Sequence, residues 1–358
     1  KEWIEYHQMI GFKTFLLMNH NSTDDTQCLL DEYASRGIVK RIPEDLALTD
    51  YHLDENVDNV FDACTRYLKS HPDQFDTTKT WMMTHDIDEF VWFNRTEQVR
   101  TLQDAITELI DENGMVAKTL EVPRFFVGSS EKDYYHSDLV LNRFTHRFRF
   151  QSCPSKRSKQ RTHRRLYYYK SPISFCDEHD RHDSYNNCKS ISLVESLAEN
   201  CSDPKTGKDM ACHFTHYHTL KSSKRKHYNA FGKQHSFKSL HLTREHDERY
   251  LGMHVVGKKI AIMHYLTKSR QEFYERVCSS VWLKKYRICP TCTPESYFNI
   301  TESFANNYPD YRMLPFAAKL KSIVDVSTIG DSCNTEYPRH SFNFFRECLA
   351  RGKSSTII

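Results

Sequence analysis

The sequence predicts an α/β fold in which helices pack against a sheet that begins with parallel strands. Three observations indicate this fold. Up to residue 93, segments with helical apolar spacing alternate three times with short apolar runs. Polar turns follow two of those runs, at residues 19–25 and 86–89. Aromatic residues make up 13% of the chain, which is enough to build a core and too many for a disordered protein.

The first elements can be placed in order. A helix is predicted over residues 1–11, because Gly11 suits its end and one helical face carries Trp3, Ile4, His7 and Ile10. A near-continuous apolar run at residues 13–19 predicts a strand covered on both faces. The polar turn after it opens a helix that runs to about Arg36, and residues 38–42 form the next strand.

The same alternation continues with a helix at residues 52–71, stopped by Pro72, a strand at 81–83 and a helix near 102–111. Later segments predict strands at residues 115–127, 139–150, 165–173, 189–194 and 258–263, and a helix at 269–285. Beyond Arg287 the chain is punctuated by Cys and Pro. We therefore divide it into a domain of residues 1–285 and a C-terminal extension of residues 286–358, tied by disulfides.

Two carboxylates stand out where the strand at residues 81–83 ends. In an extended segment Asp86 and Asp88 would point to one side and Ile87 to the other. Carboxylates enclosed by aromatic residues are costly to bury without compensation, and hard divalent cations prefer such oxygens. A metal site is one interpretation, and a surface turn or helix cap is the other. The turn at residues 19–25 follows a parallel strand too, and the ends of such strands form ligand sites.

Composition narrows the class of protein. The net charge of +3 does not indicate a nucleic-acid partner. Basic residues do cluster at Lys156, Arg157, Lys159, Arg161, Arg164 and Arg165, as a solvated loop or as a site for an anionic acceptor or membrane surface. The 12 cysteines and the sequons at Asn21, Asn94 and Asn299 favour an oxidising, secretory compartment. No apolar run is long enough to span a membrane, and no signal peptide is visible.

An ordered set of motifs resembles glycosyltransferase family 92 and related glycosyltransferase-2-like sequences. The set covers about residues 1–285. In chain order, its members are Glu2-Trp3-Ile4-Glu5-Tyr6-His7, Asn19-x-Asn21-Ser22-Thr23-Asp24, Asp86-Ile87-Asp88-Glu89-Phe90, Arg124-Phe125-Phe126-Val127-Gly128-Ser129-Ser130, Asn142-Arg143-Phe144, Lys189-Ser190-Ile191 with His213, and Ile262-Met263-His264-Tyr265. Asn142-Arg143-Phe144 is similar to a strand of the family.

The resemblance implies a GT-A-like, Rossmann-type mixed sheet with helices on both faces. It implies a metal-dependent, inverting transfer from a nucleotide-sugar donor, with a UDP-sugar expected and galactose among the candidate sugars. Asp86 and Asp88 match the Asp-x-Asp motif that binds Mn²⁺ or Mg²⁺, and His264 matches a late histidine of the metal shell. The expected donor-binding residues are Asn19, Asn21, Asp24 and Asp86. Helix capping is the alternative role for Asp24.

Further residues are expected to bind the acceptor, which we expect to be a glycan or glycoconjugate. We expect the later half of the domain to provide this wall of the site, with the acceptor-binding residues Gly128, Ser129, Lys189 and His213. The plainer alternatives are that Gly128 is only a turn residue and that Lys189 lies at the surface. The general base is expected to be Glu89 or Asp138, and Glu89 could instead orient the metal ligands.

Two departures from the family pattern remain. The family's opening strand, with its nucleotide-contacting loop, would precede Glu2, so we expect the first strand of the sheet to be missing here. Met263 stands where the family often has asparagine. The full-length protein is expected in the Golgi lumen as a type II membrane protein whose anchor lies outside this chain. The alternative function is a non-catalytic carbohydrate-binding protein of the same fold.

Overall fold

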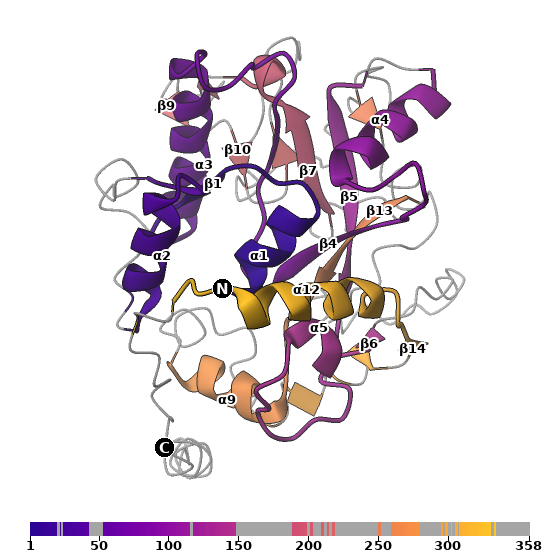
Figure 1. Cartoon of the computed structure of the whole chain (residues 1–358). Coiled ribbons are helices and arrows are strands. Elements are labelled where there is room, and N and C mark those ends of the chain that lie inside the picture. The colour runs from indigo at the N-terminus through magenta and orange to yellow at the C-terminus, as the bar shows by residue number, and fades with distance from the viewer. Residues whose placement is uncertain are drawn as a thin grey trace, which may run out of the picture.

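The structure is a computed structural model of the whole chain (Figure 1). It describes residues 1–19, 22, 24–42, 53–114, 117–147, 188–198, 201–202, 209–210, 213–214, 217–218, 250–251, 259–279, 295, 298–299, 302, 305–306, 308–330 and 333. The predicted strand at residues 165–173 and the basic cluster at residues 156–165 lie outside this part.

The predicted alternation of helices and strands is confirmed. It runs through α1 (Glu2–Met9), β1 (Phe15–Leu17), α2 (Thr26–Ser35), β2 (Val39–Arg41), α3 (Leu53–Ser70) and β3 (Trp81–Met83). Gly11 follows α1 with a φ of +110°, a conformation that favours glycine. A Cβ there would also lie 3.1 Å from Thr101 Cβ, so this glycine fixes where the chain leaves α1.

The main sheet has six strands and is mixed. Its order is β3-β7-β5-β13-β4, with β12 also paired to β5. The further strands are β4 (Glu89–Phe93), β5 (Thr119–Phe126), β7 (Cys188–Leu193), β12 (Tyr250–Leu251) and β13 (Ile260–His264). Both β12 and β13 are parallel to β5, whereas β7 is antiparallel to β3 and β5, and β4 is antiparallel to β13. The predicted parallel pairing holds for β1 and β2, which form a separate two-stranded sheet.

Short pairs complete the described strands. They are β6 (His146–Arg147) with β14 (Tyr308–Pro309), β8 (Cys201–Ser202) with β9 (Asp209–Met210), and β10 (His213–Phe214) with β11 (Tyr217–His218). A 3₁₀ turn, η4 (Val194–Ser196), follows β7.

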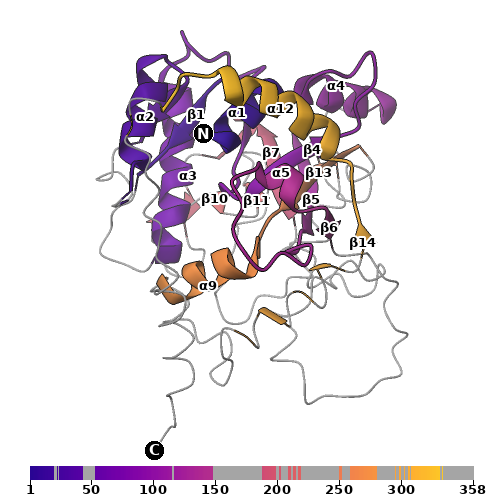
Figure 2. The same cartoon turned by 60° about the horizontal axis from the view of Figure 1, so that its bottom comes forward.

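Helices cover both faces at the β3 edge of the main sheet. The side chain of Met82 packs with Cys64 and Leu68 of α3. Trp81 and Met83 alternate to the other face and pack in the main core with α1 and α4 (Leu102–Glu112). Figures 1 and 2 accordingly show α3 and α4 on opposite sides of the central strands. Thr101 and Asp104 form a capping box that starts α4 at the predicted place.

One predicted element is wrong, and one helix was missed. Residues 140–143, expected in a strand, form the short helix α5 (Val140–Arg143). The cause is tertiary, because the Glu2 carboxylate accepts hydrogen bonds from the backbone amides of Val140 (3.1 Å) and Leu141 (3.4 Å). A helix was also missed, since α12 (Leu314–Val326) lies in a stretch for which no periodicity was predicted. The predicted helix at residues 269–285 is α9 (Arg270–Ser279).

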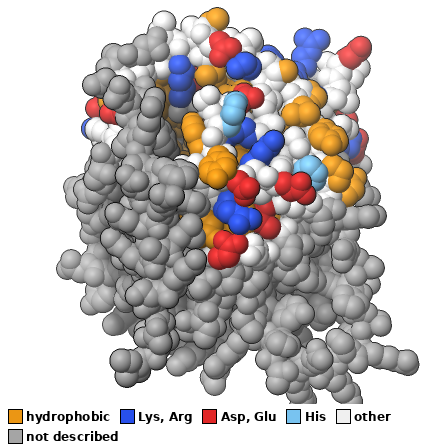
Figure 3. Space-filling view, turned by 90° about the horizontal axis from the view of Figure 1, so that it is seen from below, with side chains coloured by type: hydrophobic (Ala, Val, Ile, Leu, Met, Phe, Trp, Pro, Cys, Tyr) orange, Lys and Arg blue, Asp and Glu red, His pale blue; other side chains and the backbone are white. Residues whose placement is uncertain are grey.

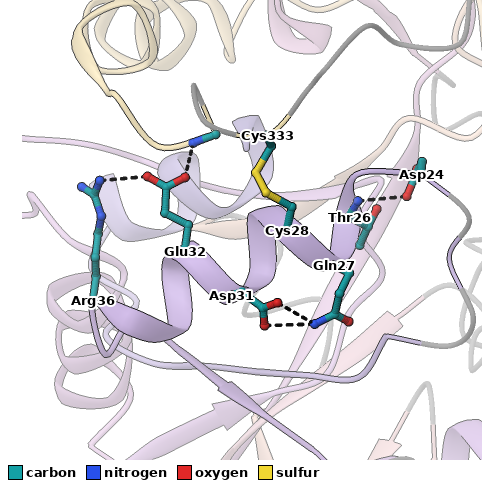
Figure 4. The surroundings of a disulfide bond; sticks show 9 residues. Asp24, Thr26, Gln27, Cys28, Asp31, Glu32, Arg36 and Cys333 are labelled. Carbon is teal, nitrogen blue, oxygen red and sulfur yellow. Dashed lines mark hydrogen bonds and ion pairs between the residues drawn. A yellow bond between two sulfur atoms is a disulfide. The ribbon is translucent and has the colours of Figure 1, made fainter.

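The C-terminal segment packs on the main core. Phe316, Ala317 and Leu320 of α12 are buried with Tyr6 of α1, and α12 crosses over α1 and α5 in both cartoon views (Figures 1 and 2). A disulfide joins Cys28 on α2 to Cys333, 305 residues later (Figure 4). The predicted extension is therefore tied to the first domain by a disulfide and by a shared core. No described helix is long and apolar enough to cross a membrane.

A cavity of about 460 Å³ separates the two sheets between β1 and β3. Strand residues of β1 and β3 line it, together with Val60 and Cys64 of α3 and with Ile106 of α4. In the described part of the chain β1 pairs only with β2, and β3 pairs only with β7. Both strands thus turn an unpaired edge toward the cavity.

Candidate functional site

The two aspartates lie in a tight turn between β3 and β4. The Glu89 amide donates to the Asp86 carbonyl oxygen at 3.0 Å, which closes a four-residue turn with Ile87 and Asp88 at its centre. Ile87 is 75% exposed at the tip. The predicted extended geometry, with both aspartates on one side, is therefore wrong. The turn lets the two carboxylates reach different partners.

Asp86 is paired with a lysine from the centre of the main sheet. Lys189, on β7, is fully buried, and its Nζ lies 3.1 Å from Asp86 Oδ2 and 3.5 Å from Glu89 Oε2. The alternative that Lys189 lies at the surface is wrong. The structure places this lysine with the aspartate turn, which is the predicted donor and metal side of the site. We accordingly move Lys189 from the acceptor to the donor side.

Glu89 is a buried carboxylate held by two cations. Its Oε1 accepts a hydrogen bond from Arg124 Nη1 at 2.9 Å, and its Oε2 accepts one from the Asp86 amide at 3.1 Å. Burial alone would raise the pKa of Glu89, but Lys189 and Arg124 outweigh it and leave the pKa below its usual value. A general base must reach the acceptor hydroxyl. Glu89 is fully buried, so its geometry favours the other predicted role, which is to orient its neighbours.

Asp88 lies between a histidine and an arginine. Its Oδ1 is 3.4 Å from His264 Nε2 at the end of β13, and its Oδ2 is 3.0 Å from Arg276 Nη1 on α9. The Asp88 carbonyl oxygen also accepts the Tyr265 amide at 2.8 Å, which fixes the turn against β13. Burial opposes ionisation of Asp88, yet His264, Arg276 and Lys268 hold its pKa well below the usual range. Asp88 is therefore a charged, 12% exposed carboxylate at neutral pH.

Two of the three predicted metal ligands are close together. Asp88 Oδ1 and His264 Nε2 are near enough to share one ion, and a carboxylate with an imidazole suits Mn²⁺. Asp86 is turned toward Lys189 instead. Among the described residues, no three His, Cys, Asp or Glu side chains are grouped to hold a metal ion. Asp88 and His264 thus fit the predicted ion, and Asp86 would join them only by exchanging its partner Lys189.

The predicted donor residues of the early turn are engaged locally. Asn19 Nδ2 donates to Gln27 Oε1 at 2.8 Å, which holds the end of β1 against α2. Asp24 is exposed, and its Oδ1 accepts the Thr26 amide at 3.0 Å (Figure 4). This bond comes from the residue just before the N-cap of α2, which is Asp25, so it agrees with the role at the helix start named as the alternative for Asp24. Asn21 lies outside the described residues, and donor binding by this turn stays a prediction.

The turn predicted to meet the acceptor is covered by the chain itself. A Cβ at Gly128 would lie 2.3 Å from Asn306 Oδ1, so glycine is required by close packing. Ser129 is buried, its amide donates to Glu302 Oε1 at 3.0 Å, and its hydroxyl donates to the same carboxylate. The geometry supports the alternative of a structural turn for Gly128. The prediction that Ser129 faces an open acceptor site has no support in this packing.

Two predicted site residues remain, Asp138 and His213. The Oδ1 of Asp138 accepts the Leu139 amide at 2.8 Å and the Asn142 amide nitrogen at 3.2 Å, so Asp138 stabilises the start of α5. The N-cap of α5 is Leu139, so Asp138 holds the segment just before this helix, and its role as a general base stays a prediction. His213 is on β10, in register with His218, and the placement of its side chain lies outside the described part.

Two functional candidates were missed from the sequence. Arg124 lies in β5 between the apolar pairs Val122-Pro123 and Phe125-Phe126, and an arginine in such surroundings was a usable signal for a buried partner. Arg276 gave no such signal, because it is one of several charged residues on α9. Only the fold brings it to Asp88.

Comparison with known proteins finds one family. The model of the family described as glycosyltransferase family 92 matches residues 1–196, a range that includes Asp86, Asp88, Glu89 and Lys189. The curated proteins contain no significant match to the chain.

Proposed function

The chain belongs to glycosyltransferase family 92, and we propose that it is a metal-dependent, inverting enzyme that moves a sugar from a UDP-sugar to a hydroxyl of a glycan or glycoconjugate. Family membership makes it a glycosyltransferase. The metal, the stereochemistry, the hexose donor and the acceptor class are proposals. The observation that supports them most is Asp88, a charged and largely buried carboxylate facing His264 at the end of a core strand.

The protein's own residues have distinct roles in this proposal. Asp88 and His264 would hold Mn²⁺ or Mg²⁺, which when bound neutralises charge on a diphosphate leaving group. Glu89 is a positioning residue, because it fixes Lys189 and Arg124 beside the turn. Lys189 in turn restrains Asp86. The buried ion pairs make the turn a rigid platform, which transfer requires if the donor is to be oriented for attack.

The cavity between β1 and β3 supports a GT-A arrangement. Strand edges form two of its walls, and α3 and α4 cover its faces. An additional strand in this position would pair with both edges and join the two sheets into one. Strands that are covered by helices on both faces are typical of such α/β sheets. We propose this position for the opening strand implied by the family resemblance.

A secretory location is also part of the proposal. The disulfide Cys28–Cys333 is typical of proteins that fold in an oxidising compartment. The described sequon asparagines, Asn94 and Asn299, are both exposed, as glycosylation requires. The Golgi lumen is the proposed site of action.

The decisive test replaces Asp88 with asparagine in the full chain. Release of UDP and sugar transfer are measured over a panel of UDP-sugars with Mn²⁺. Asp88→Asn should lower kcat/KM by roughly 100-fold or more, because a charged group at the reaction centre is removed. Asp111→Asn, an exposed aspartate of α4, is the matched control and should keep full activity. Normal turnover and Mn²⁺ dependence in Asp88→Asn would overturn the site assignment.

One observation favours a second candidate, the non-catalytic carbohydrate-binding protein. Both aspartates are already paired with cations, Asp86 with Lys189 and Asp88 with Arg276, as in a site that has no need of a metal. This candidate predicts that the folded protein binds a glycan and releases no UDP from any donor, with or without Mn²⁺. Turnover of one UDP-sugar would exclude it.

A further inference from the structure

The charges around the aspartate turn cancel before any ligand binds. Three carboxylates, those of Asp86, Asp88 and Glu89, contact three cations, those of Lys189, Arg124 and Arg276. Counted without His264, the formal sum of these six side chains is zero. A divalent ion approaching alone therefore meets a neutral cluster instead of three negative charges, and its attraction to Asp88 is weak.

The three cations differ in what holds them. Lys189 and Arg124 are buried against Glu89, so moving either one would leave a buried charge unpaired, which is strongly unfavourable. Arg276 is different, because its side chain is 52% exposed on α9. Its Nη1 contacts Asp88 Oδ2 at 3.0 Å and the Leu266 carbonyl oxygen at 3.1 Å. The arginine end of this ion pair is open to water, so Arg276 can change partner at small cost provided that another cation takes its place at the largely buried Asp88.

The position of Arg276 suits a phosphate ligand. The described part of the face seen from below, where α9 lies, carries acidic and basic side chains side by side (Figure 3). A guanidinium can bind two phosphate oxygens through parallel hydrogen bonds, whereas Arg276 reaches Asp88 through Nη1 alone. A diphosphate beside Asp88 would thus attract Arg276 away from Oδ2 and leave the negative charge of this carboxylate available to a metal ion.

We propose that Arg276 recognises the diphosphate of the donor and covers Asp88 until donor and metal arrive together. This inference rests on the proposed function. It makes the two ligands interdependent, because the diphosphate removes the arginine from Asp88 and the metal then gains the uncovered carboxylate. The free protein should bind Mn²⁺ weakly, and UDP should raise its affinity for Mn²⁺.

Binding of Mn²⁺, followed by the electron paramagnetic resonance signal of the free ion, tests this without any turnover. In the unaltered chain, saturating UDP should increase the affinity for Mn²⁺ by roughly tenfold or more, the usual range of coupling between sites. Arg276→Gln should bind Mn²⁺ alone more tightly and should lose most of the increase caused by UDP. Arg276→Lys keeps the positive charge but loses the parallel donors of the guanidinium. Its affinity for Mn²⁺, with and without UDP, should lie between those of the unaltered chain and of Arg276→Gln.

Arg36→Gln is the matched control. Arg36 is also an exposed arginine, 44% exposed and 3.0 Å from Glu32, but it is the C-cap of α2, away from the turn. Arg36→Gln should leave the affinity for Mn²⁺ unchanged, both without UDP and with it. If Arg276→Gln leaves the UDP effect on Mn²⁺ binding intact, the role of Arg276 is wrong while the proposed function stands. If the folded, unaltered chain binds no Mn²⁺ even with UDP, the proposed function fails and this inference fails with it.

Discussion

Lys189 Nζ lies 3.1 Å from Asp86 Oδ2, although 103 residues separate the two in the sequence. The contact joins the centre of the main sheet to the turn that carries the candidate site. Because Lys189 is fully buried, its charge depends on Asp86 and Glu89 for compensation. The local geometry of the site and the stability of the sheet are therefore coupled through one side chain.

Replacing Lys189 with methionine should destabilise the protein by about 3 kcal/mol, because Glu89 would stay buried with only part of its compensation. Urea unfolding measures this change in the free energy of unfolding. Lys118→Met is the control, since Lys118 forms an ion pair of 2.7 Å with Glu195 that is about one-third exposed, and should cost about 1 kcal/mol or less. Equal effects of the two substitutions would contradict a special role for Lys189.

Ser129→Ala tests whether the turn after β5 is structural or binds the acceptor. The hydroxyl and amide of Ser129 both bind the Glu302 carboxylate in a buried position. Removing the hydroxyl should lower the free energy of unfolding by about 1–2 kcal/mol and leave the KM for the acceptor unchanged. Ser35→Ala, at the exposed end of α2, should have almost no effect on stability. A raised acceptor KM with unchanged stability would restore the acceptor role.

The local pattern predicted most elements of the fold because apolar spacing determines them directly. The alternation through β3, the helix α4 and the core strands β5, β7 and β13 all follow from it. Helix α5 could not be predicted, because the Glu2 carboxylate that caps it is 138 residues away from Val140. Helix α12 had a usable signal that was overlooked, since proline near the first turn of a helix is favourable.

The sequence indicated the aspartates of the candidate site but not the cations that pair with them. Asp86 and Asp88 follow an apolar run, and that position alone indicated their importance. Their cations come from β7 and α9, more than 100 residues further along the chain. No spacing rule connects such positions, so the neutral charge of the cluster is a property of the fold.

The disulfide between Cys28 and Cys333 should contribute substantially to stability. It closes a loop of 305 residues and holds the segment after α12 on α2, where the Gly330 amide also donates to Glu32 (Figure 4). Replacing both cysteines with serine should cost about 3–5 kcal/mol, seen as a lower midpoint in urea. Peptide mapping of the unaltered protein should recover the linked pair, and two free thiols there would contradict the pairing. Disulfides among the other predicted cysteines stay a prediction.

Cys64 is a free cysteine in the described part of the chain, so it serves as the control for the peptide mapping. Cys64 lies on α3, its thiol is free and buried, and burial raises its pKa to about 12. It should therefore resist alkylation by iodoacetamide in the folded protein at pH 8 and react only after unfolding.

The unpaired strand edges at the cavity should be visible in amide hydrogen exchange. The Phe15 amide donates to Ile38 and the Leu17 carbonyl accepts from Ile42, the residues on either side of β2, so the backbone groups of Leu16 face the cavity. By the same alternation the backbone groups of Met83 point toward the cavity, whereas those of Met82 point toward β7. The amides of Leu16 and Met83 should exchange faster than those of Leu17 and Met82 by roughly tenfold or more. Equal protection would show that another segment already pairs with these edges.

The buried histidine His7 should make the protein sensitive to acid. His7 Nδ1 donates to the Trp3 carbonyl oxygen at 2.7 Å, and its Nε2 lies 3.1 Å from His85 Nε2 among aromatic rings. Burial, and next the neighbouring His85, lower the pKa of His7 well below its usual value. The unfolded chain binds a proton at His7 below about pH 6.5, whereas the folded chain does not, so stability falls as the pH falls through that range.

Between pH 7 and pH 5, His7 should account for up to about 2 kcal/mol of lost stability. His7→Phe removes the titrating group and suits the surrounding rings of Trp3, Phe12 and Phe90. Its free energy of unfolding, measured in urea at both pH values, should therefore depend less on pH by that amount, whatever its absolute stability. His136→Phe changes an exposed histidine and should keep the original pH dependence. An unaltered slope in His7→Phe would mean that folded His7 binds protons as readily as the unfolded chain.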